Sequence, residues 1–92
     1  MDKALRAEWL PKWVEALRSG KYRQACGVLR AESGAFCCLG VLREIRGSWE
    51  GLSNNEILTH DELLDLVDRN DGSGGYPRHS FPEIADYIEG NL

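Results

Sequence analysis

The longest uncharged apolar run in this chain spans residues 35–42 (AFCCLGVL), directly after a turn-forming Glu-Ser-Gly at residues 32–34. Eight residues are too few to cross a bilayer, so the run must be buried within the protein. Its small cysteine and glycine side chains suit a segment that neighbours press closely. We expect a strand that gives way to a helix running from about Leu39 to Arg46, with Gly47 as its stop.

Helical periodicity marks both ends of the chain. The first helix has apolar residues on one face at i, i+4 spacing, namely Leu5, Trp9, Leu10, Trp13, Val14 and Leu17. Pro11 lies inside this pattern, so we expect the helix to kink or restart there and to end at Gly20. The last helix has Phe81, Ile84, Ala85 and Ile88 at helical spacing, and Gly90 follows as its predicted stop.

Three capping boxes mark helix starts, at Ser53-x-x-Glu56, Thr59-x-x-Glu62 and Ser80-x-x-Glu83. The first predicts a single turn. The second predicts a helix over about residues 60–69 that buries Leu63, Leu64 and Val67, and the third opens the last helix. Residues 70–75 (NDGSGG) have the composition of a flexible loop.

Residues 26–30 and 35–38 flank the turn at 32–34 and are typical of a short β-hairpin. A two-stranded hairpin is marginal by itself and needs helices packed on it. The fold class that we predict is therefore α+β, a small single domain in which a short β-hairpin packs against about four helices.

Ninety-two residues support one hydrophobic core. We expect Trp49 to close one edge of it. The other expected core residues are Trp13, Leu17, Val28, Leu29, Phe36, Cys38, Leu39, Leu42, Ile45, Leu63, Val67, Phe81, Ile84 and Ile88.

Charge is distributed unevenly along the chain. Residues 1–46 carry a net charge of +4 and residues 47–92 a net charge of −8, which add to −4. The basic half could attract phosphates, whereas the acidic half would repel duplex nucleic acid and suit a basic protein surface. Alternatively, the two halves attract one another across the fold.

The three cysteines, Cys26, Cys37 and Cys38, are an odd number and unlike a secreted disulfide framework. No secretory signal opens the chain, so we expect a cytoplasmic protein with no membrane segment. Side chains of neighbouring strand residues point to opposite faces, so Cys37 and Cys38 are expected to be buried structural residues. His60 and His79 lie far from them in sequence. We therefore expect no enzymatic activity, no metal and no cofactor.

Two clusters are candidates for binding. Basic and aromatic residues could hold phosphate and stack on a base, and this candidate ligand site comprises Lys12, Trp13, Arg18, Lys21, Tyr22, Arg23, Gln24 and Arg30. The alternative is that Trp13 and Tyr22 belong to the core and the cations are simply solvated. Acidic residues for contact with a basic protein are Asp61, Asp65, Asp68 and Glu89, although a solvated helix face would look the same.

The motifs Lys12-Trp13-x3-Leu17-x-Ser19-Gly20-x-Tyr22-x-Gln24 and Phe36-Cys37-Cys38-Leu39-Gly40-Val41-Leu42 resemble a family of small proteins encoded by bacteriophages and prophages. The closing segment, Ser80-Phe81-x-Glu83-Ile84-Ala85-Asp86-x-Ile88-Glu89, is similar to that family's last helix. The chain departs from the family at Ala25-Cys26 and at Arg43-Glu44, where relatives more often have glycine with a basic residue and cysteine with aspartate. Both departures weaken the case for shared cysteine chemistry.

The resemblance implies a phage protein of unknown biochemistry that works in the cytoplasm of a host bacterium. Our leading hypothesis is a non-catalytic binding protein that counters host antiviral defence by stoichiometric inhibition of a defence protein, as anti-CRISPR proteins do. One alternative is sequestration of a nucleotide immune signal by the basic and aromatic residues. Another is a regulatory or assembly factor of the phage. A core this small also allows a homo-oligomer.

Overall fold

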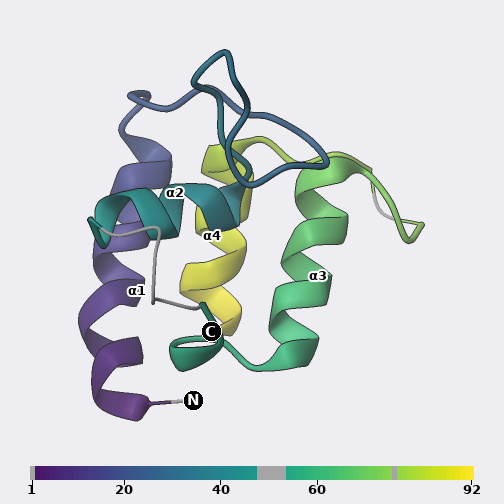
Figure 1. Cartoon of the computed structure of the whole chain (residues 1–92). Helices are drawn as coiled ribbons and strands as arrows, with labels where there is room; N and C mark the ends of the chain where they lie inside the picture. The colour runs from purple at the N-terminus through teal and green to yellow at the C-terminus, as the bar shows by residue number, and fades with distance from the viewer. Residues whose placement is uncertain (1, 48–53, 76) are drawn as a thin grey trace.

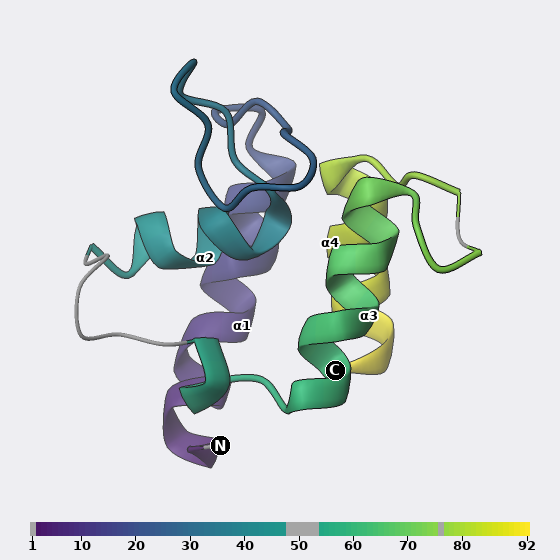
Figure 2. The same cartoon turned by 45° about the vertical axis from the view of Figure 1, so that its right-hand side comes forward.

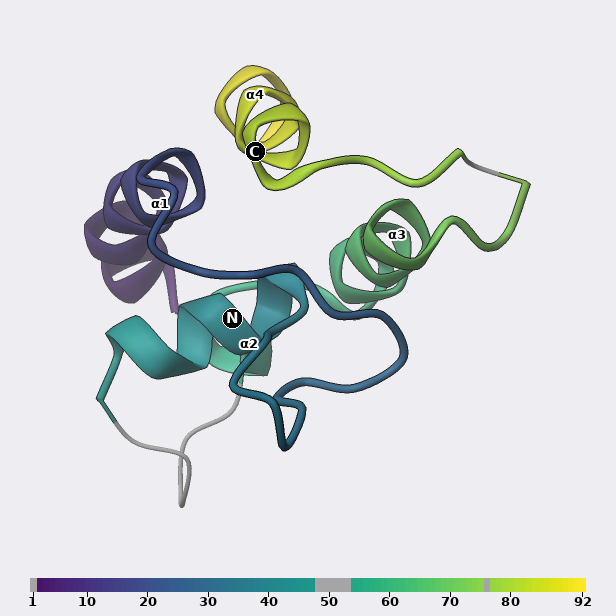
Figure 3. The ribbon, with the colours of Figure 1, turned by 90° about the horizontal axis from the view of Figure 1, so that it is seen from above.

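The computed structural model describes residues 2–47, 54–75 and 77–92. Over these residues the chain forms α1 (Lys3–Arg18), α2 (Cys38–Ile45), the 3-10 turn η1 (Asn54–Glu56), α3 (His60–Asp71) and α4 (Phe81–Asn91). Helices α1 and α4 run antiparallel, α3 lies on the other side of α4 from α1, and α2 lies crosswise (Figures 1 and 3). None of the described helices combines the length and apolar character needed to span a bilayer.

The predicted α+β class is wrong, because the described residues contain helices and no β-strand. Only isolated bridges form, both at Phe36, with Gln24 on one side and Arg30 on the other. The predicted second strand does not extend beyond Phe36, because the next residue, Cys37, is already the N-cap of α2. Residues 19–37 instead form a long looped connection above the helices (Figure 2).

The core prediction is confirmed around the apolar run. Trp13, Cys38 and Leu42 are completely buried, and Phe36 is 7% exposed. The other predicted residues that are buried are Leu17, Leu39, Phe81, Ile84 and Ile88, while Ile45 and Leu63 are partly buried against them. The burial expected for the apolar run is also confirmed at Ala35, Cys37 and Val41. The buried core further includes residues that the list of core residues lacked, namely Val14, Ile57, Leu58, Leu66 and Ala85. Trp49 lies outside the described residues.

Four apolar residues predicted to be buried are exposed instead. Val28 and Leu29 are 48% and 39% exposed because the hairpin that would have covered them does not form. Leu64 and Val67 are 53% and 36% exposed because α3 turns Leu66 and Asn70 inward.

Most helix ends follow the sequence signals. Both described capping boxes form, at Thr59 and Ser80, and Gly20 and Gly47 adopt positive φ after α1 and α2. Helix α1 continues through Pro11 as one helix rather than restarting. Helix α4 runs through Gly90 to Asn91 and has Leu92 as its C-cap, so the predicted stop at Gly90 is two residues too early. The Ser53 cap lies outside the described residues, although η1 does form a single turn.

The loop before α2 lies directly on its first turn. The backbone N–H of Cys37 donates to the carbonyl of Leu29 at 3.3 Å. A Cβ placed on Gly40 would lie 1.8 Å from that same carbonyl oxygen, so only glycine lets the two backbones approach this closely. The absence of a side chain at Gly40 therefore lets residues 26–30 pack directly on α2, although no sheet forms among the described residues.

The side chain of Asn70 joins α3 to the loop and to α2. It is completely buried, and its Oδ1 accepts hydrogen bonds from the Cys38 backbone N–H at 3.1 Å and from Gln24 Nε2 at 3.0 Å. Its Nδ2 donates to the Ala25 carbonyl and to Asp71 Oδ1, both at 2.8 Å. All four hydrogen-bonding positions of this carboxamide are thus satisfied by different groups.

Ion pairs link the basic first half of the chain to the acidic second half. Arg6 of α1 forms a two-point contact with Glu62 of α3, at 2.6 and 2.8 Å. Further pairs of this kind are Arg18 with Asp86, Arg18 with Glu89, and Arg46 with Glu56. Part of the opposite charge of the two halves is therefore neutralised by ion pairs between them.

Replacing Asn70 with alanine is expected to lower the free energy of unfolding by about 2–4 kcal/mol, because buried groups at Cys38 and Ala25 lose their partner. Urea denaturation followed by circular dichroism measures this loss. The matched control is Asn91→Ala, since Asn91 is exposed and donates one bond to the Tyr87 carbonyl. Equal effects of the two substitutions would contradict the role given to Asn70.

The Arg6 guanidinium lowers the pKa of Glu62 from 4.5 to about 2. A carboxylate whose pKa is lower in the folded state stabilises the protein above its unfolded pKa and loses this contribution as pH falls through its folded pKa. The stability difference between wild type and Glu62→Gln should therefore shrink as pH falls from about 5 to about 2.

Urea titrations at several pH values test this dependence. Gln at position 62 can keep the capping-box bond to the Thr59 backbone, so the substitution removes the charge and spares the cap. Glu83→Gln is the control for the capping bond, because Glu83 is exposed and makes the equivalent bond to Ser80, which also lowers the pKa of Glu83; the pH dependence beyond that of this control belongs to the Arg6 pair. A pH-independent difference for Glu62→Gln would show that the ion pair contributes nothing.

Candidate functional site

The most exposed large hydrophobic side chains of the described residues gather on one surface, which we call the α3 patch. It consists of Val28 and Leu29 from the loop and Leu64 and Val67 from α3. Val28, Leu29 and Val67 line one hollow of about 180 Å³. Leu64 lies three residues before Val67, on the same side of the helix. Two segments distant in sequence thus build one apolar surface.

The fold holds both parts of the α3 patch in place. Leu66 and Asn70 are completely buried, and their inward orientation turns Leu64 and Val67 toward solvent. The loop part is positioned by the close approach of the Leu29 carbonyl to Gly40 and by the bond from Asn70 to the Ala25 carbonyl. The patch is therefore built on restrained backbone.

Carboxylates surround the apolar residues of α3. Asp61 and Asp68 lie three residues before and four residues after Leu64, so they flank it on the same helix face. Asp61 is exposed, and Asp68 accepts a hydrogen bond from the Ser73 hydroxyl at 2.8 Å. Asp71 lines the hollow beside Val67. The α3 patch thus has an apolar centre and an acidic rim.

The other two predicted acidic contact residues lie elsewhere. Asp65 Oδ2 accepts hydrogen bonds from the Tyr87 hydroxyl at 2.6 Å and from Arg69 Nε at 3.0 Å, and the bond to Asp65 raises the pKa of Tyr87. The Arg69 guanidinium also lies 3.8 Å from the centre of the Tyr87 ring. Glu89 pairs with Arg18 on α1. The structure therefore brings Asp61 and Asp68 together and separates Asp65 and Glu89 from them.

The structure divides the predicted basic and aromatic cluster. Trp13 is completely buried and donates its indole N–H to the Cys38 carbonyl at 2.9 Å, so its ring offers no exposed face for stacking. Gln24 belongs to the Asn70 network. Arg18 is held by two carboxylates, and Arg23 donates to the Ser33 carbonyl.

The remaining members of the cluster are closer to solvent. Lys12, Lys21 and Tyr22 line a hollow of about 210 Å³, which also contains a carboxylate, that of Glu15. Tyr22 is partly buried and packs edge-on against Phe36, with ring centres 5.7 Å apart. Arg30 is exposed and lies in the loop next to Leu29.

Cys37 and Cys38 are buried free thiols. Desolvation raises the pKa of both, so both stay protonated and unreactive at neutral pH. The role of Cys37 is structural: it is the N-cap of α2, and its Sγ accepts a hydrogen bond from the Gly40 backbone N–H. In the described part of the chain, no three His, Cys, Asp or Glu residues form a group able to hold a metal ion.

Sequence reasoning missed the α3 patch because it assigned all four apolar residues to the core. One signal was available, since Asp61, Leu64, Asp68 and Asp71 share one face of the predicted helix. An apolar residue among carboxylates indicates an exposed position. No comparable signal joins Val28 and Leu29 to that face.

A family model described as a domain of unknown function (DUF8296) matches residues 5–60. That range covers α1 except its first two residues, the loop, α2 and η1, and it therefore includes the loop part of the α3 patch. Neither a curated protein nor a solved structure matches the chain.

The burial of the cysteines predicts a simple labelling pattern. Iodoacetamide at pH 8 should modify Cys26 in the native protein, because Cys26 is exposed, and should reach Cys37 and Cys38 only after denaturation. Intact-mass spectrometry counts the adducts, and Cys26→Ser should remove native labelling. Rapid native labelling of the Cys26→Ser protein would contradict the burial of the other two thiols.

Proposed function

The chain belongs to the DUF8296 family, a domain of unknown function. We propose that this member is a phage-encoded, non-catalytic binding protein that counters host antiviral defence. It binds one defence protein stoichiometrically, as anti-CRISPR proteins do. The observation that carries this proposal is the α3 patch, with Leu64 53% exposed between Asp61 and Asp68.

The α3 patch has the composition of a protein-binding surface. Exposed apolar residues that adjoin one another, with polar residues around them, are typical of contact sites for another protein. Large hydrophobic side chains at the centre of such a surface supply most of the binding energy, and the rim excludes water. Leu64 and Val67 would lie at the centre of the contact. The rim would be formed by Asp61, Asp68 and Asp71.

The charge of the rim selects the class of partner. Residues 47–92 carry a net charge of −8, and only part of this is neutralised by the arginines of the first half. An acidic surface favours a basic partner and accelerates its association. Defence proteins that act on nucleic acid display such basic surfaces. Occupying that surface would block the defence protein without any catalytic step.

The nucleotide-sequestering alternative has one observation in its favour, because Lys12, Lys21 and Tyr22 line a common hollow. Cations and an aromatic ring suit a phosphate and a base. However, Glu15 adds a negative charge in the same hollow. A regulatory or assembly factor of the phage would use the α3 patch on a phage protein rather than a host protein.

Substituting Leu64 with lysine tests the proposal, because it removes the apolar centre and opposes a basic partner. In bacterial strains that each carry one defined defence system, the wild-type chain should restore phage plating in at least one. Leu64→Lys should abolish this rescue and weaken binding to the purified defence protein at least roughly 10-fold in calorimetry, about 1.4 kcal/mol.

Ala7→Lys is the matched control, because it adds the same charge at an exposed site on α1 and should preserve rescue. Raising the salt concentration should weaken wild-type binding. Circular dichroism verifies that each variant is folded. Rescue by folded Leu64→Lys would overturn the proposal, and loss of rescue in Lys21→Ala alone would favour nucleotide sequestration instead.

A further inference from the structure

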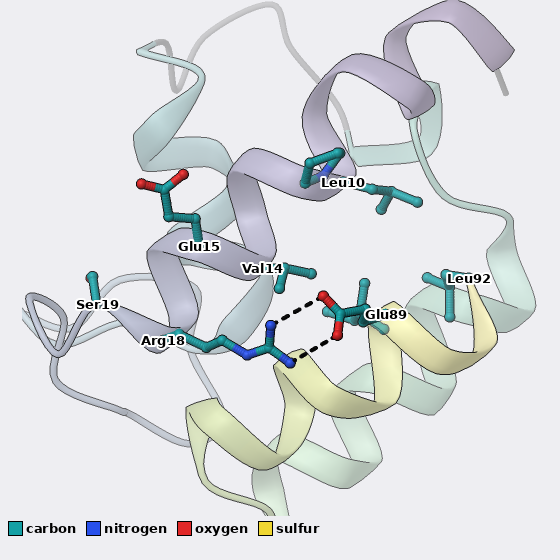
Figure 4. A pocket seen from close by; sticks show the side chains of 9 residues that line it. Leu10, Val14, Glu15, Arg18, Ser19, Glu89 and Leu92 are labelled. Atoms are coloured by element: carbon teal, nitrogen blue, oxygen red, sulfur yellow. Dashed lines mark hydrogen bonds and ion pairs between the residues drawn. The ribbon is translucent and has the colours of Figure 1, made fainter.

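A groove of about 680 Å³ lies between α1 and α4, neither of which contributes to the α3 patch (Figure 4). Its apolar lining comes from Leu10 and Val14 of α1 and from Ile88 and Leu92 at the end of the chain; Val14 and Ile88 are buried and form its floor, and Leu10 and Leu92 are partly exposed. Arg18 and Glu89 meet across the groove, as the dashed lines in Figure 4 show.

The shape of the groove suits a helix. Its α1 side is built from residues 10, 14 and 18, together with their neighbours 11, 15 and 19, so it repeats every four residues along one helix face. The eight steps from residue 10 to residue 18, at about 1.5 Å each, give a length of about 12 Å, or roughly two helical turns. A trough between two antiparallel helices is where a further helix packs in a bundle.

The charges at one end of the groove are unbalanced. Arg18 Nη2 lies 2.5 Å from Asp86 Oδ1, and Arg18 Nη1 lies 3.1 Å from Glu89 Oε2, so two carboxylates share one guanidinium. Glu15 also lines the groove and is exposed. The two carboxylates of Asp86 and Glu89 beside one arginine leave a net charge of −1 here, and Glu15 is left out of this sum because it also lies beside Lys12 and Lys21 in the neighbouring hollow.

The ion pairs at this end are exposed, with side-chain exposures of 38% for Arg18, 74% for Asp86 and 63% for Glu89. Exposed pairs contribute little to stability, so giving one up costs the fold little. A cation arriving in the groove could therefore take one of these carboxylates while Arg18 keeps the other.

We propose that the groove between α1 and α4 binds an amphipathic α-helix of a partner protein. The apolar stripe of that helix lies on the partly exposed Leu10 and Leu92, above the buried Val14 and Ile88, and a lysine or arginine at one end of the stripe pairs with Glu89. This site uses helices other than α3, so it does not rest on the function proposed for the α3 patch.

A synthetic helix tests the proposal directly. The probe is a fluorescein-labelled peptide of 15 residues with leucines at i, i+3, i+4 and i+7 and lysines at its other positions, and the counter-probe carries glutamates instead of lysines. Fluorescence anisotropy should show binding of the lysine probe alone. Amide chemical-shift changes in ¹H–¹⁵N spectra should map to α1 and α4.

Matched variants separate this site from general attraction to an acidic protein. Glu89→Lys should weaken probe binding about 3–10-fold at low salt, whereas Glu32→Lys, with the same charge change in an exposed loop, should not. Leu10→Ser should also weaken binding, and Leu64→Ser in the α3 patch should not.

Several outcomes would overturn the proposal. These are equal losses for Glu89→Lys and Glu32→Lys, shift changes centred on α3, and tight binding of the glutamate probe. Sedimentation that shows a dimer abolished by Glu89→Lys would assign the groove to a second copy of this chain instead. Circular dichroism of each variant ensures that a loss of binding is not a loss of fold.

Discussion

The carboxamide of Asn70 holds together parts of the chain that are far apart in sequence. It accepts from the first N–H of α2 and donates to the Ala25 carbonyl, and through Gln24 Nε2 it is linked to the His79 carbonyl just before α4. The Cys38 N–H is buried and the Ala25 carbonyl is partly buried, and both would lose this hydrogen-bond partner without Asn70. The network takes the place of the sheet that the apolar run 35–42 suggested, because it satisfies the backbone where no ladder forms.

The same constraint produces the exposed α3 patch. With Asn70 and Leu66 facing inward, helical geometry turns Leu64 and Val67 outward. The loop that Asn70 and Gly40 hold brings Val28 and Leu29 to the same hollow. The apolar surface is therefore a consequence of how the core is closed, and its position is as well defined as the core itself.

The charged residues of this protein stabilise contacts between helices and also give the surface of the second half a negative charge. Arg6 with Glu62, and Arg18 with Asp86 and Glu89, join α1 to α3 and α4, so the opposite net charges of the two halves help to assemble the fold. The acidic half has more carboxylates than these arginines neutralise. The excess remains on α3 and α4, where it gives both the rim of the α3 patch and one end of the α1–α4 groove their negative charge.

The sequence by itself determined what depends on near neighbours: the capping boxes at Thr59 and Ser80, the positive-φ turns at Gly20 and Gly47, and the burial of residues 35–42. These rest on local hydrogen bonds and on periodicity, both of which can be read along the chain. Only the tertiary structure decided that residues 26–30 form a loop, that Asn70 is a core residue, and that Trp13 and Gln24 are structural. It also decided that Val28 and Leu29 meet Val67 and that Arg18 meets Glu89, because the partners in such contacts lie tens of residues apart. Whether a side chain is exposed or forms an ion pair depends on which distant segment packs beside it, and a local sequence pattern does not show which segment that is.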